Sequence, residues 1–328
     1  MQSGKATFSA NSDVALVKYW GKKDDVLRLP ENGSVSMTLG ALQTITTVEF
    51  REDLTRDIVV IAGESDELES ARVSEQLDRI RERMATRRFA RVASENTFPR
   101  GTGLSSSGSG FAALTCAAAA AADLSLTKQE LSILARRASG TACRCVCGGY
   151  VEWKDGETSE TSYAETIFPA EYWDLRDVIV VVDEGRKRVS STEGHKTAGS
   201  SPFFPVRQTH IGKKIVAVKE AIGQRDFSRL GDLIEAEALE FHTILLTSAP
   251  PLIAWYPGTV QVMLEVQQMR RERLPAYFTI NTGFNIHVLT LPEYETKVQA
   301  RLNALSLVKS TMLSGVGQEP GPADNHLF

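Results

Sequence analysis

A stretch rich in glycine and serine lies at residues 98–110 (FPRGTGLSSSGSG), immediately before a run of alanines. Glycine lets the backbone approach a ligand closely, and serine supplies hydroxyl donors. The alanine-rich helix expected next would present free N–H groups and a partial positive charge at its N-terminus. Together these features suit the binding of phosphate groups such as those of a nucleotide.

This loop does not match the two best-known phosphate-binding motifs. No Gly-Lys-Ser or Gly-Lys-Thr ends it, so it is not a Walker A loop. It lies far from the first expected strand and lacks the full glycine pattern of a dinucleotide-binding fingerprint. Composition alone fits a flexible turn equally well, and the helix expected directly after the loop favours phosphate binding.

Cysteine usage argues against a metal site and for a reducing compartment. Three of the four cysteines, Cys143, Cys145 and Cys147, alternate along the chain. On an extended strand they would share one face and could not wrap around one metal. No CxxC pair or nearby histidine completes a zinc set. We therefore predict buried free thiols in a reducing compartment. Residues 1–10 are too polar for a signal peptide, and residues 110–124 are too short to span a bilayer, so we predict a cytoplasmic location.

Composition excludes several classes of protein. The 328 residues are 42% hydrophobic and 24% charged, which is typical of a globular protein. The formal net charge of -4 disfavours a nucleic-acid-binding role. A local basic cleft for an anionic substrate remains compatible with that charge.

The hydrophobic patterns predict interleaved strands and helices without a strict βαβ rhythm. Strand and loop together are expected at 6–19, and strands at 44–50, 57–62, 89–96, 178–183, 277–281 and 286–291. Helices are expected at 67–88, 110–124, 128–138, 212–223, 227–246 and 260–273, and a last helix, after the strand at 286–291, ends at residue 305. The stretch 184–201 is expected to be irregular. These elements predict an α+β fold of two lobes that divide near residues 185–200.

Several blocks in this order resemble the diphosphomevalonate decarboxylases of the GHMP kinase superfamily. They are 15–22 (ALVKYWGK), 29–39 (LPENGSVSMTL), the serine loop, 139–144 (SGTACR), 148–153 (GGYVEW), 189–194 (VSSTEG) and 281–285 (NTGFN). The resemblance implies a GHMP-kinase-like α+β fold, with a ribosomal-protein-S5-like N-terminal lobe (1–190) and a ferredoxin-like C-terminal lobe (191–328). The active site would lie in the cleft between the lobes, and the protein would be a homodimer.

The resemblance also implies a reaction. ATP, with Mg2+, would phosphorylate the C3 hydroxyl of 5-phosphomevalonate or 5-diphosphomevalonate. Loss of that phosphate and of CO2 would give isopentenyl phosphate or diphosphate. Phosphoryl transfer needs positioning and charge neutralisation, and a guanidinium such as that of Arg144 matches a carboxylate in two parallel hydrogen bonds.

The family motifs assign roles to individual residues. The catalytic candidates are Asn281, Lys22 and Arg144. The candidates that bind substrate are Lys18, Tyr19, Ser139, Thr141, Arg144, Ser191 and Thr192. The candidates that bind ATP are Gly101, Gly103, Ser105, Ser106, Ser107, Gly108 and Ser109, with Ser107 also a candidate ligand of Mg2+. Lys18 and Lys22 are also compatible with solvated surface lysines, and His195 and His242 with no functional role.

The chain departs from the family at Asn281, where the family has an aspartate that serves as candidate general base. Asparagine can hydrogen-bond the C3 hydroxyl but cannot take its proton. An engineered variant, a natural decarboxylase that needs no base, and a divergent relative all fit. The alternatives to a decarboxylase are a mevalonate 3-kinase and a non-catalytic nucleotide- or metabolite-binding paralogue. Glu193 would repel a diphosphate, so we expect a preference for the monophosphate.

Overall fold

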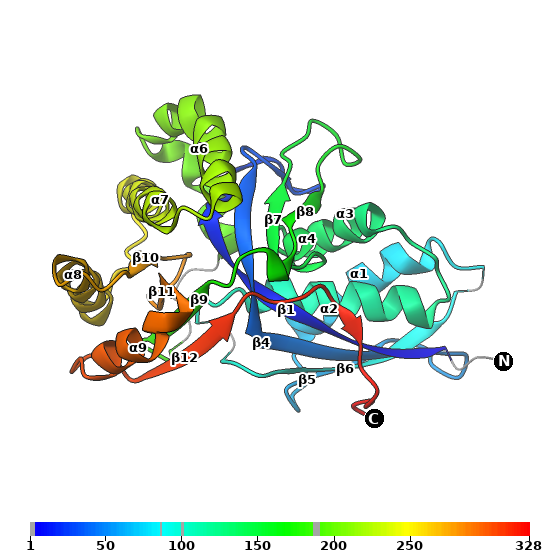
Figure 1. The fold of residues 1–328 in the computed structure, drawn as a ribbon. Helices are drawn as coiled ribbons and strands as arrows, with labels where there is room; N and C mark the ends of the chain where they lie inside the picture. The colour runs from blue at the N-terminus through cyan, green and yellow to red at the C-terminus, as the bar shows by residue number, and fades with distance from the viewer. Residues whose placement is uncertain (1–3, 86, 100–101, 186–190) are drawn as a thin grey trace.

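The fold is α+β, as expected, and contains two antiparallel-rich sheets with helices packed against them (Figure 1). The computed structural model describes residues 4–85, 87–99, 102–185 and 191–328. The larger sheet has the order β13-β1-β4-β6-β5, and β7 and β8 extend it from β4. Its strands are β1 (Lys5–Val17), β4 (Ser34–Arg51), β5 (Ile58–Ile61), β6 (Phe89–Asn96), β7 (Tyr150–Trp153), β8 (Ala164–Phe168) and β13 (Gly321–Pro322).

Helices cover one face of this larger sheet. They are α1 (Glu67–Arg81), α2 (Ser106–Ala121), α3 (Lys128–Ala138) and the short α4 (Ala142–Cys145). The alanines of α2 let that helix lie close against β1 and β4, and nearly all of them are buried. The capping box of Thr127 and Glu130 begins α3 at the predicted residue.

The smaller sheet has the order β10-β11-β9-β12. Its strands are β9 (Arg176–Val181), β10 (Tyr277–Thr279), β11 (Ile286–Thr290) and β12 (Ser310–Gly315). Strand alternation turns Val178 and Val180 toward α8 (Pro257–Arg271) and α9 (Glu295–Asn303). Ile179 points the opposite way, toward the larger sheet and the long antiparallel helices α6 (Phe204–Gln224) and α7 (Phe227–Thr247).

The remaining elements are short. The strands β2 (Lys22–Asp24) and β3 (Leu29–Pro30) form a small hairpin, and α5 (Ser191–Lys196) is a six-residue helix. Three single-turn 3-10 helices lie at η1 (Ala170–Tyr172), η2 (Ala198–Ser200) and η3 (Pro292–Tyr294).

The division predicted at residue 190 does not follow the two sheets. Strand β9 precedes that residue but pairs within the smaller sheet. The C-terminal segment leaves β12 and runs back along β1, so that both termini lie at the same end of the molecule (Figure 1). Gln318 on this segment accepts a hydrogen bond from Asn11 Nδ2 at 2.8 Å. Among the described residues, the chain therefore passes from the larger sheet to the smaller one after β8 and returns after β12.

Several local predictions need correction. The helix expected at 67–88 ends at Arg81, and the stretch 184–201, expected to be irregular, contains α5. The cysteine segment is helical over Ala142–Cys145, so its thiols do not alternate along a strand. All four cysteines are nevertheless free and buried, as predicted. Strands β7, β8 and β12 were not predicted.

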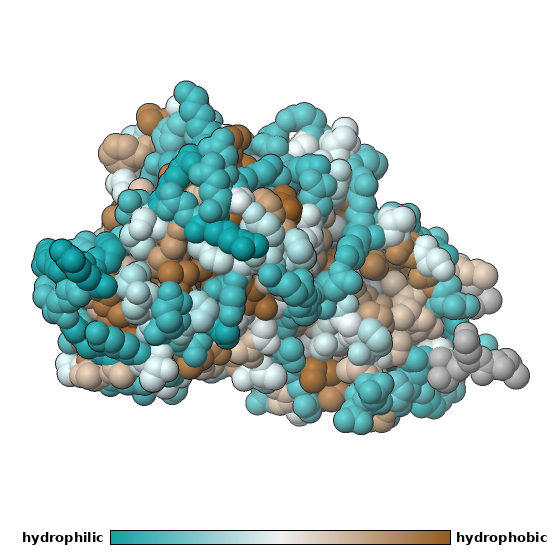
Figure 2. All heavy atoms as spheres, in the orientation of Figure 1, coloured by the Kyte–Doolittle hydropathy of each residue, from teal (hydrophilic) through white to brown (hydrophobic). Residues whose placement is uncertain are grey.

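The surface is mostly polar on the face shown in Figure 2, where hydrophobic residues appear in small groups between hydrophilic ones. Within the described ranges, no helix has both the length and the apolar character needed to cross a membrane.

Candidate active site

A cavity of about 460 Å³ lies where the end of β1, the start of α2, α4, α5 and the loop after β10 meet. It brings together predicted residues that are far apart in the sequence. The predicted residues that line it are Lys18, Tyr19, Lys22, Gly103, Ser105, Ser106, Ser107, Ser139, Thr141, Arg144, Ser191, Thr192 and Asn281. The cavity is therefore built from both the N-terminal and the C-terminal part of the chain.

The start of α2 offers its backbone N–H groups to this cavity. No side chain caps the helix, because Ser105 adopts a left-handed conformation (φ 58°) and its Oγ donates to Asp13 Oδ1 at 3.2 Å. Gly103 (φ 94°) lies against Gly283, and a Cβ at Gly103 would come within 2.7 Å of the Gly283 Cα. Only glycine fits this approach, which fixes the serine loop against the loop that carries Asn281.

Two of the predicted phosphate-binding residues, Gly108 and Ser109, do not line the cavity. The Ser109 hydroxyl is buried and hydrogen-bonded to Thr44 Oγ1 at 2.7 Å. Gly108 packs against Cys145 Sγ and does not line the cavity. Gly101 lies outside the described residues. Ser109 and Gly108 thus have packing roles, and the Ser105 hydroxyl is engaged by Asp13. Ser106 and Ser107 remain as candidates for phosphate, with Ser107 Oγ 3.3 Å from Ser139 Oγ.

Arg144 is buried and held by two neighbours. Its Nε donates to Asp13 Oδ2 at 2.6 Å, and its Nη1 donates to Ser34 Oγ at 2.7 Å. Burial alone would lower the pKa of Arg144, but the Asp13 carboxylate outweighs that effect and raises it. In the described part of the chain Nη2 has no hydrogen-bond partner, so one edge of a charged, oriented guanidinium is available to a carboxylate in the cavity.

Lys18 is buried rather than solvated, contrary to the surface interpretation. Its Nζ donates to the Ala15 carbonyl at 2.5 Å and to Thr279 Oγ1 at 2.7 Å, and lies 3.4 Å from Asn281 Oδ1. Burial lowers the pKa of Lys18 to about 7. Because no carboxylate of the described residues forms an ion pair with it, Lys18 can contribute a positive charge to the cavity.

Asn281 faces Lys18 and is held from both sides. Its Oδ1 also accepts a hydrogen bond from the Ala15 N–H at 3.3 Å. Its carbonyl accepts from His242 Nε2 at 3.0 Å. Burial lowers the pKa of His242 to about 3, so this imidazole is neutral and donates through Nε2. His242 is thus a structural support of the Asn281 loop.

His195 lies in the cavity wall, although the sequence offered no functional role for it. Its ring packs between Tyr19 (centroids 4.2 Å apart) and Trp20 (4.3 Å). Its Nδ1 accepts a hydrogen bond from the Gly21 N–H at 3.1 Å, which places the proton of the neutral ring on Nε2. Burial raises the pKa of Tyr19, so its hydroxyl stays neutral.

Comparisons with models of protein families match two long segments of the chain. Residues 10–164 match the family model described as "Diphosphomevalonate decarboxylase-like N-terminal domain". Residues 177–320 match the "Mevalonate 5-diphosphate decarboxylase C-terminal domain". The chain belongs to the diphosphomevalonate decarboxylase family.

Relatives within this family match almost the entire chain. A phosphomevalonate decarboxylase of Haloferax volcanii is 34% identical and aligns with 98% of this chain and 97% of its own length. A diphosphomevalonate decarboxylase of Candida albicans is 33% identical over 85% of this chain and 82% of its own length. The family resemblance and its place in the GHMP kinase superfamily are therefore confirmed.

Solved structures of diphosphomevalonate decarboxylases confirm the fold. One, described as MDDEF in complex with MVAPP, AMPPCP and magnesium, has a TM-score of 0.91 and 36% identity, and covers 98% of this chain and 99% of that chain. The mevalonate diphosphate decarboxylase of Staphylococcus aureus has a TM-score of 0.92 and 33% identity, and covers 98% of each chain. The GHMP-kinase-like α+β fold was thus predicted correctly.

Many residues at the cavity of this decarboxylase-family chain were missed by sequence reasoning. Among them are Arg28, Arg72 and His195, which line the cavity, and Asp13, which lies behind it. Asp13 did carry a signal, because an acidic residue in the middle of a buried strand needs a cationic partner. Arg72 carried none, since arginine on a charged helix is usually solvated, whereas here its guanidinium lies 4.8 Å from the Phe111 ring centroid.

Proposed function

We propose that this member of the diphosphomevalonate decarboxylase family is an ATP-dependent decarboxylase of a mevalonate phosphorylated at C5. The observation that carries the proposal is one cavity that combines an uncapped helix start with serine hydroxyls, a buried lysine and a free guanidinium edge. The helix start and serines suit ATP phosphates. The guanidinium of Arg144 suits the C1 carboxylate of the substrate.

The reaction then has two balanced parts. The C3 oxygen attacks the γ-phosphorus of ATP, ADP leaves, and the hydroxyl proton passes to solvent water. The C3–O bond breaks next, with phosphate as the leaving group. The C1–C2 bond breaks to release CO2, and its electron pair forms the C2–C3 double bond. Arg144 orients the carboxylate, and Lys18 neutralises negative charge on the C3 oxygen and the transferring phosphoryl group.

Mg2+ fits the site only as a partner of the nucleotide. In the described ranges no cluster of three His, Cys, Asp or Glu side chains can hold a metal. Mg2+ is held by few protein groups plus nucleotide phosphates in many such sites. The hydroxyls of Ser106 and Ser107 line the cavity and would hold the ion together with phosphate oxygens. When bound, the ion supplies charge neutralisation at the transferred phosphoryl group.

The two serines Ser107 and Ser109 allow a matched test of the phosphate site. We expect Ser107→Ala to lower kcat/KM for ATP about tenfold, because a charge-assisted hydrogen bond contributes roughly 1.5 kcal/mol. Ser109→Ala, on the same helix, should leave kcat/KM for ATP unchanged, because its hydroxyl is bonded to Thr44. Steady-state kinetics with varied Mg-ATP measure both. Equal losses in the two variants would contradict this assignment.

The pH dependence of turnover reports the charge of Lys18. The ratio kcat/KM reflects ionisations of the free enzyme. Since the pKa of Lys18 is lowered to about 7 and its protonated form is the active one, kcat/KM for the substrate should fall as pH rises above about 7. Asn281→Asp places a carboxylate beside Nζ, which favours the protonated form. The alkaline limb of that variant should therefore move to higher pH.

A profile with no alkaline limb in the unmodified protein would show that Lys18 does not act as a cation. An alkaline limb that stays in place in Asn281→Asp would show that residue 281 does not act on Lys18. Thermal unfolding of the variant at each pH controls for loss of folded protein.

We propose that the C5 end of the substrate lies against Lys22 and Arg28 and that this wall favours a single phosphate group. Lys22 and Arg28 line this part of the cavity, but Lys22 Nζ is already paired with Asp25 at 2.5 Å. That pairing lowers the pKa of Asp25, mainly through the hydrogen bond from Lys22. Glu193, which suggested the same preference, is exposed and does not line the cavity, so the argument now rests on Lys22 and Asp25.

Substrate competition tests this preference. Mixtures of 5-phosphomevalonate and 5-diphosphomevalonate at equal concentration should give mainly product from the monophosphate. A strong preference for the diphosphate would overturn it. With mevalonate as the substrate, little ADP should form, because mevalonate has no C5 phosphate to bind at Lys22 and Arg28.

A mevalonate 3-kinase is the second candidate function, and Asn281 is the observation that favours it. A kinase of this kind would transfer the phosphoryl group and stop. The presence of Arg144 with a free edge supports the decarboxylase instead.

Two further features of the protein are proposals as well. We propose a cytoplasmic location, supported by four free buried cysteines, which are typical of a reducing compartment. A homodimer is expected from the family.

A further inference from the structure

The main chain of Lys18 is held by three side chains, two of them from the C-terminal half of the protein. Lys18 directly follows β1, where the backbone bonds of the larger sheet end. Its N–H donates to Glu237 Oε1 at 2.9 Å. Its carbonyl accepts from Arg207 Nη2 at 3.0 Å and from Asn32 Nδ2 at 2.9 Å. Both main-chain polar groups of the residue are therefore fixed by side chains.

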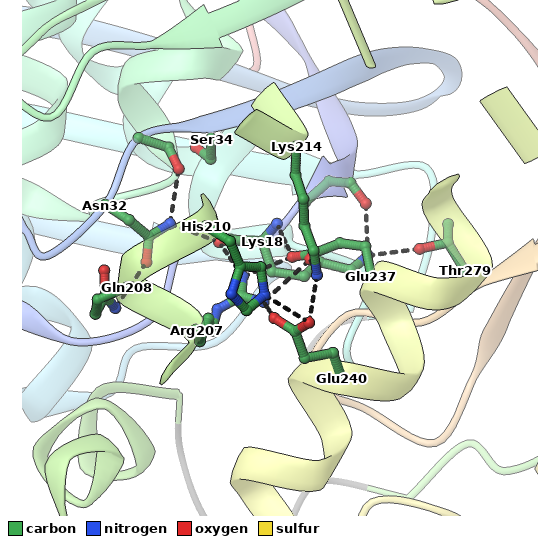
Figure 3. A network of polar contacts seen from close by, with 12 residues as sticks. Lys18, Asn32, Ser34, Arg207, Gln208, His210, Lys214, Glu237, Glu240 and Thr279 are labelled. Carbon is green, nitrogen blue, oxygen red and sulfur yellow. Dashed lines mark hydrogen bonds and ion pairs between the residues drawn. The ribbon is translucent and has the colours of Figure 1, made fainter. Parts of the chain in front are cut away.

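Glu237 on α7 and Arg207 on α6 form a two-pronged ion pair, visible at the centre of Figure 3. Arg207 Nη2 lies 2.5 Å from Glu237 Oε1, and Nη1 lies 3.0 Å from Oε2. Their side chains are 0% and 1% exposed. Burial alone would raise the pKa of Glu237, but Arg207 and then Lys214 outweigh it and lower the pKa. Glu237 is therefore a charged carboxylate directly behind Lys18.

The network continues outward from this pair toward solvent. Lys214 Nζ donates to Glu237 Oε2 at 2.9 Å and to Glu240 Oε2 at 2.6 Å. His210 Nε2 lies 3.0 Å from Glu240 Oε2. The outer side chains are 20–34% exposed, so water screens their effect on Lys18 more than it screens the effect of the buried Arg207 and Glu237.

Charged groups on four elements act on the Lys18 ammonium. Glu237 and, more weakly, Asp13 on β1 favour the charged form, whereas Arg144 on α4 and Arg207 disfavour it. Glu237 has the largest effect among these charges. His242, also on α7, is neutral because burial lowers its pKa to about 3. Glu237 thus both fixes the Lys18 backbone and offsets part of the cost of burying its ammonium.

We propose that Glu237 is a positioning residue that fixes Lys18 at the cavity and keeps its ammonium protonated, with Arg207 locking the carboxylate in place. The proposal rests on the function proposed above, in which the Lys18 cation acts on the phosphoryl group. Glu237 does not line the cavity and touches no reacting atom. Its effect is therefore expected on the ionisation of Lys18, beyond any effect on folding.

The substitution Glu237→Gln separates charge from geometry. Glutamine Oε1 can still accept the hydrogen bond from the Lys18 N–H, but the negative charge is gone. We would measure the reactivity of Lys18 toward trace acetic anhydride across pH, by mass spectrometry, in the protein without substrates. The midpoint for Lys18 should fall by about one pH unit. The alkaline limb of kcat/KM should move down by the same amount.

Two companion variants keep the test decisive. Glu235→Gln removes another buried carboxylate of α7, one paired with Arg270 at 2.6 Å, and should leave the Lys18 midpoint in place. Lys214→Met removes a half-buried cation that opposes Glu237, so it should move the midpoint upward. If Glu237→Gln does not fold, the upward shift of the Lys18 midpoint in Lys214→Met serves as the test.

The labelling experiment needs no turnover, so it separates failure of this proposal from failure of the proposed function. A lower midpoint in Glu237→Gln together with a higher one in Lys214→Met supports the proposal. An unchanged Lys18 midpoint in a folded Glu237→Gln overturns it, even if activity is lost. If Glu237→Gln does not fold, an unchanged or lower midpoint in Lys214→Met overturns it instead.

Discussion

Replacing Lys18 with methionine is expected to lower kcat on 5-phosphomevalonate by about a thousandfold, the loss typical of removing one preorganised charge from an active site. Methionine keeps the length and apolar character of the stem but removes the ammonium that lies beside Asn281. Stability should not fall greatly, because an apolar side chain replaces a cation in a buried position. Single-turnover measurement of ADP would show the effect on the phosphoryl-transfer step itself.

Lys219 provides a matched control for this substitution. It pairs with Glu152 at 2.7 Å, lies outside the cavity and is partly exposed. Lys219→Met should leave kcat close to that of the unmodified protein. If Lys18→Met kept most of its activity, the charge at this position would have no part in the reaction.

Removing the guanidinium of Arg144 should have the second large effect. Arg144→Gln is expected to lower kcat/KM for the substrate about a thousandfold, because the carboxylate loses its charged hydrogen-bond donor in a buried site. It should also lower the free energy of unfolding by about 3–5 kcal/mol, because Asp13 would be left as an unpaired buried charge. Chemical denaturation and steady-state kinetics measure the two effects separately.

A double variant distinguishes the two roles of Arg144. Adding Asp13→Asn to Arg144→Gln removes the unpaired charge, so most of the stability should return. Activity should not return, because no guanidinium faces the substrate. Recovery of activity together with stability would mean that Arg144 is only a structural residue.

Local signals in the sequence predicted much of the fold. The helix at Lys128–Ala138 begins and ends as predicted, because its capping box and apolar spacing act within a few residues. The serine loop before α2 was predicted for the same reason: glycine, serine and an alanine run are adjacent in the chain. Strands β7 and β8 were missed because neither has a strongly β-branched run of ordinary length.

The role of a residue in the site could be predicted only where a family motif includes that residue. Lys18 was considered a possible surface lysine because its partners, Glu237 and Thr279, are 219 and 261 residues away. The pairing of Asp13 with Arg144 spans 131 residues. Ser109 shows the opposite error: its type and position fit phosphate binding, but the helix turns its hydroxyl toward Thr44. Such outcomes depend on which side chains the fold brings together.

The most direct test of the proposed activity follows both products from one labelled substrate. The protein, with Mg-ATP and 5-phosphomevalonate labelled at C1, should release CO2 and ADP in equal amounts, with Asn281 in place. ADP without labelled CO2 would contradict the decarboxylase and establish a kinase. Release of neither product would contradict both activities.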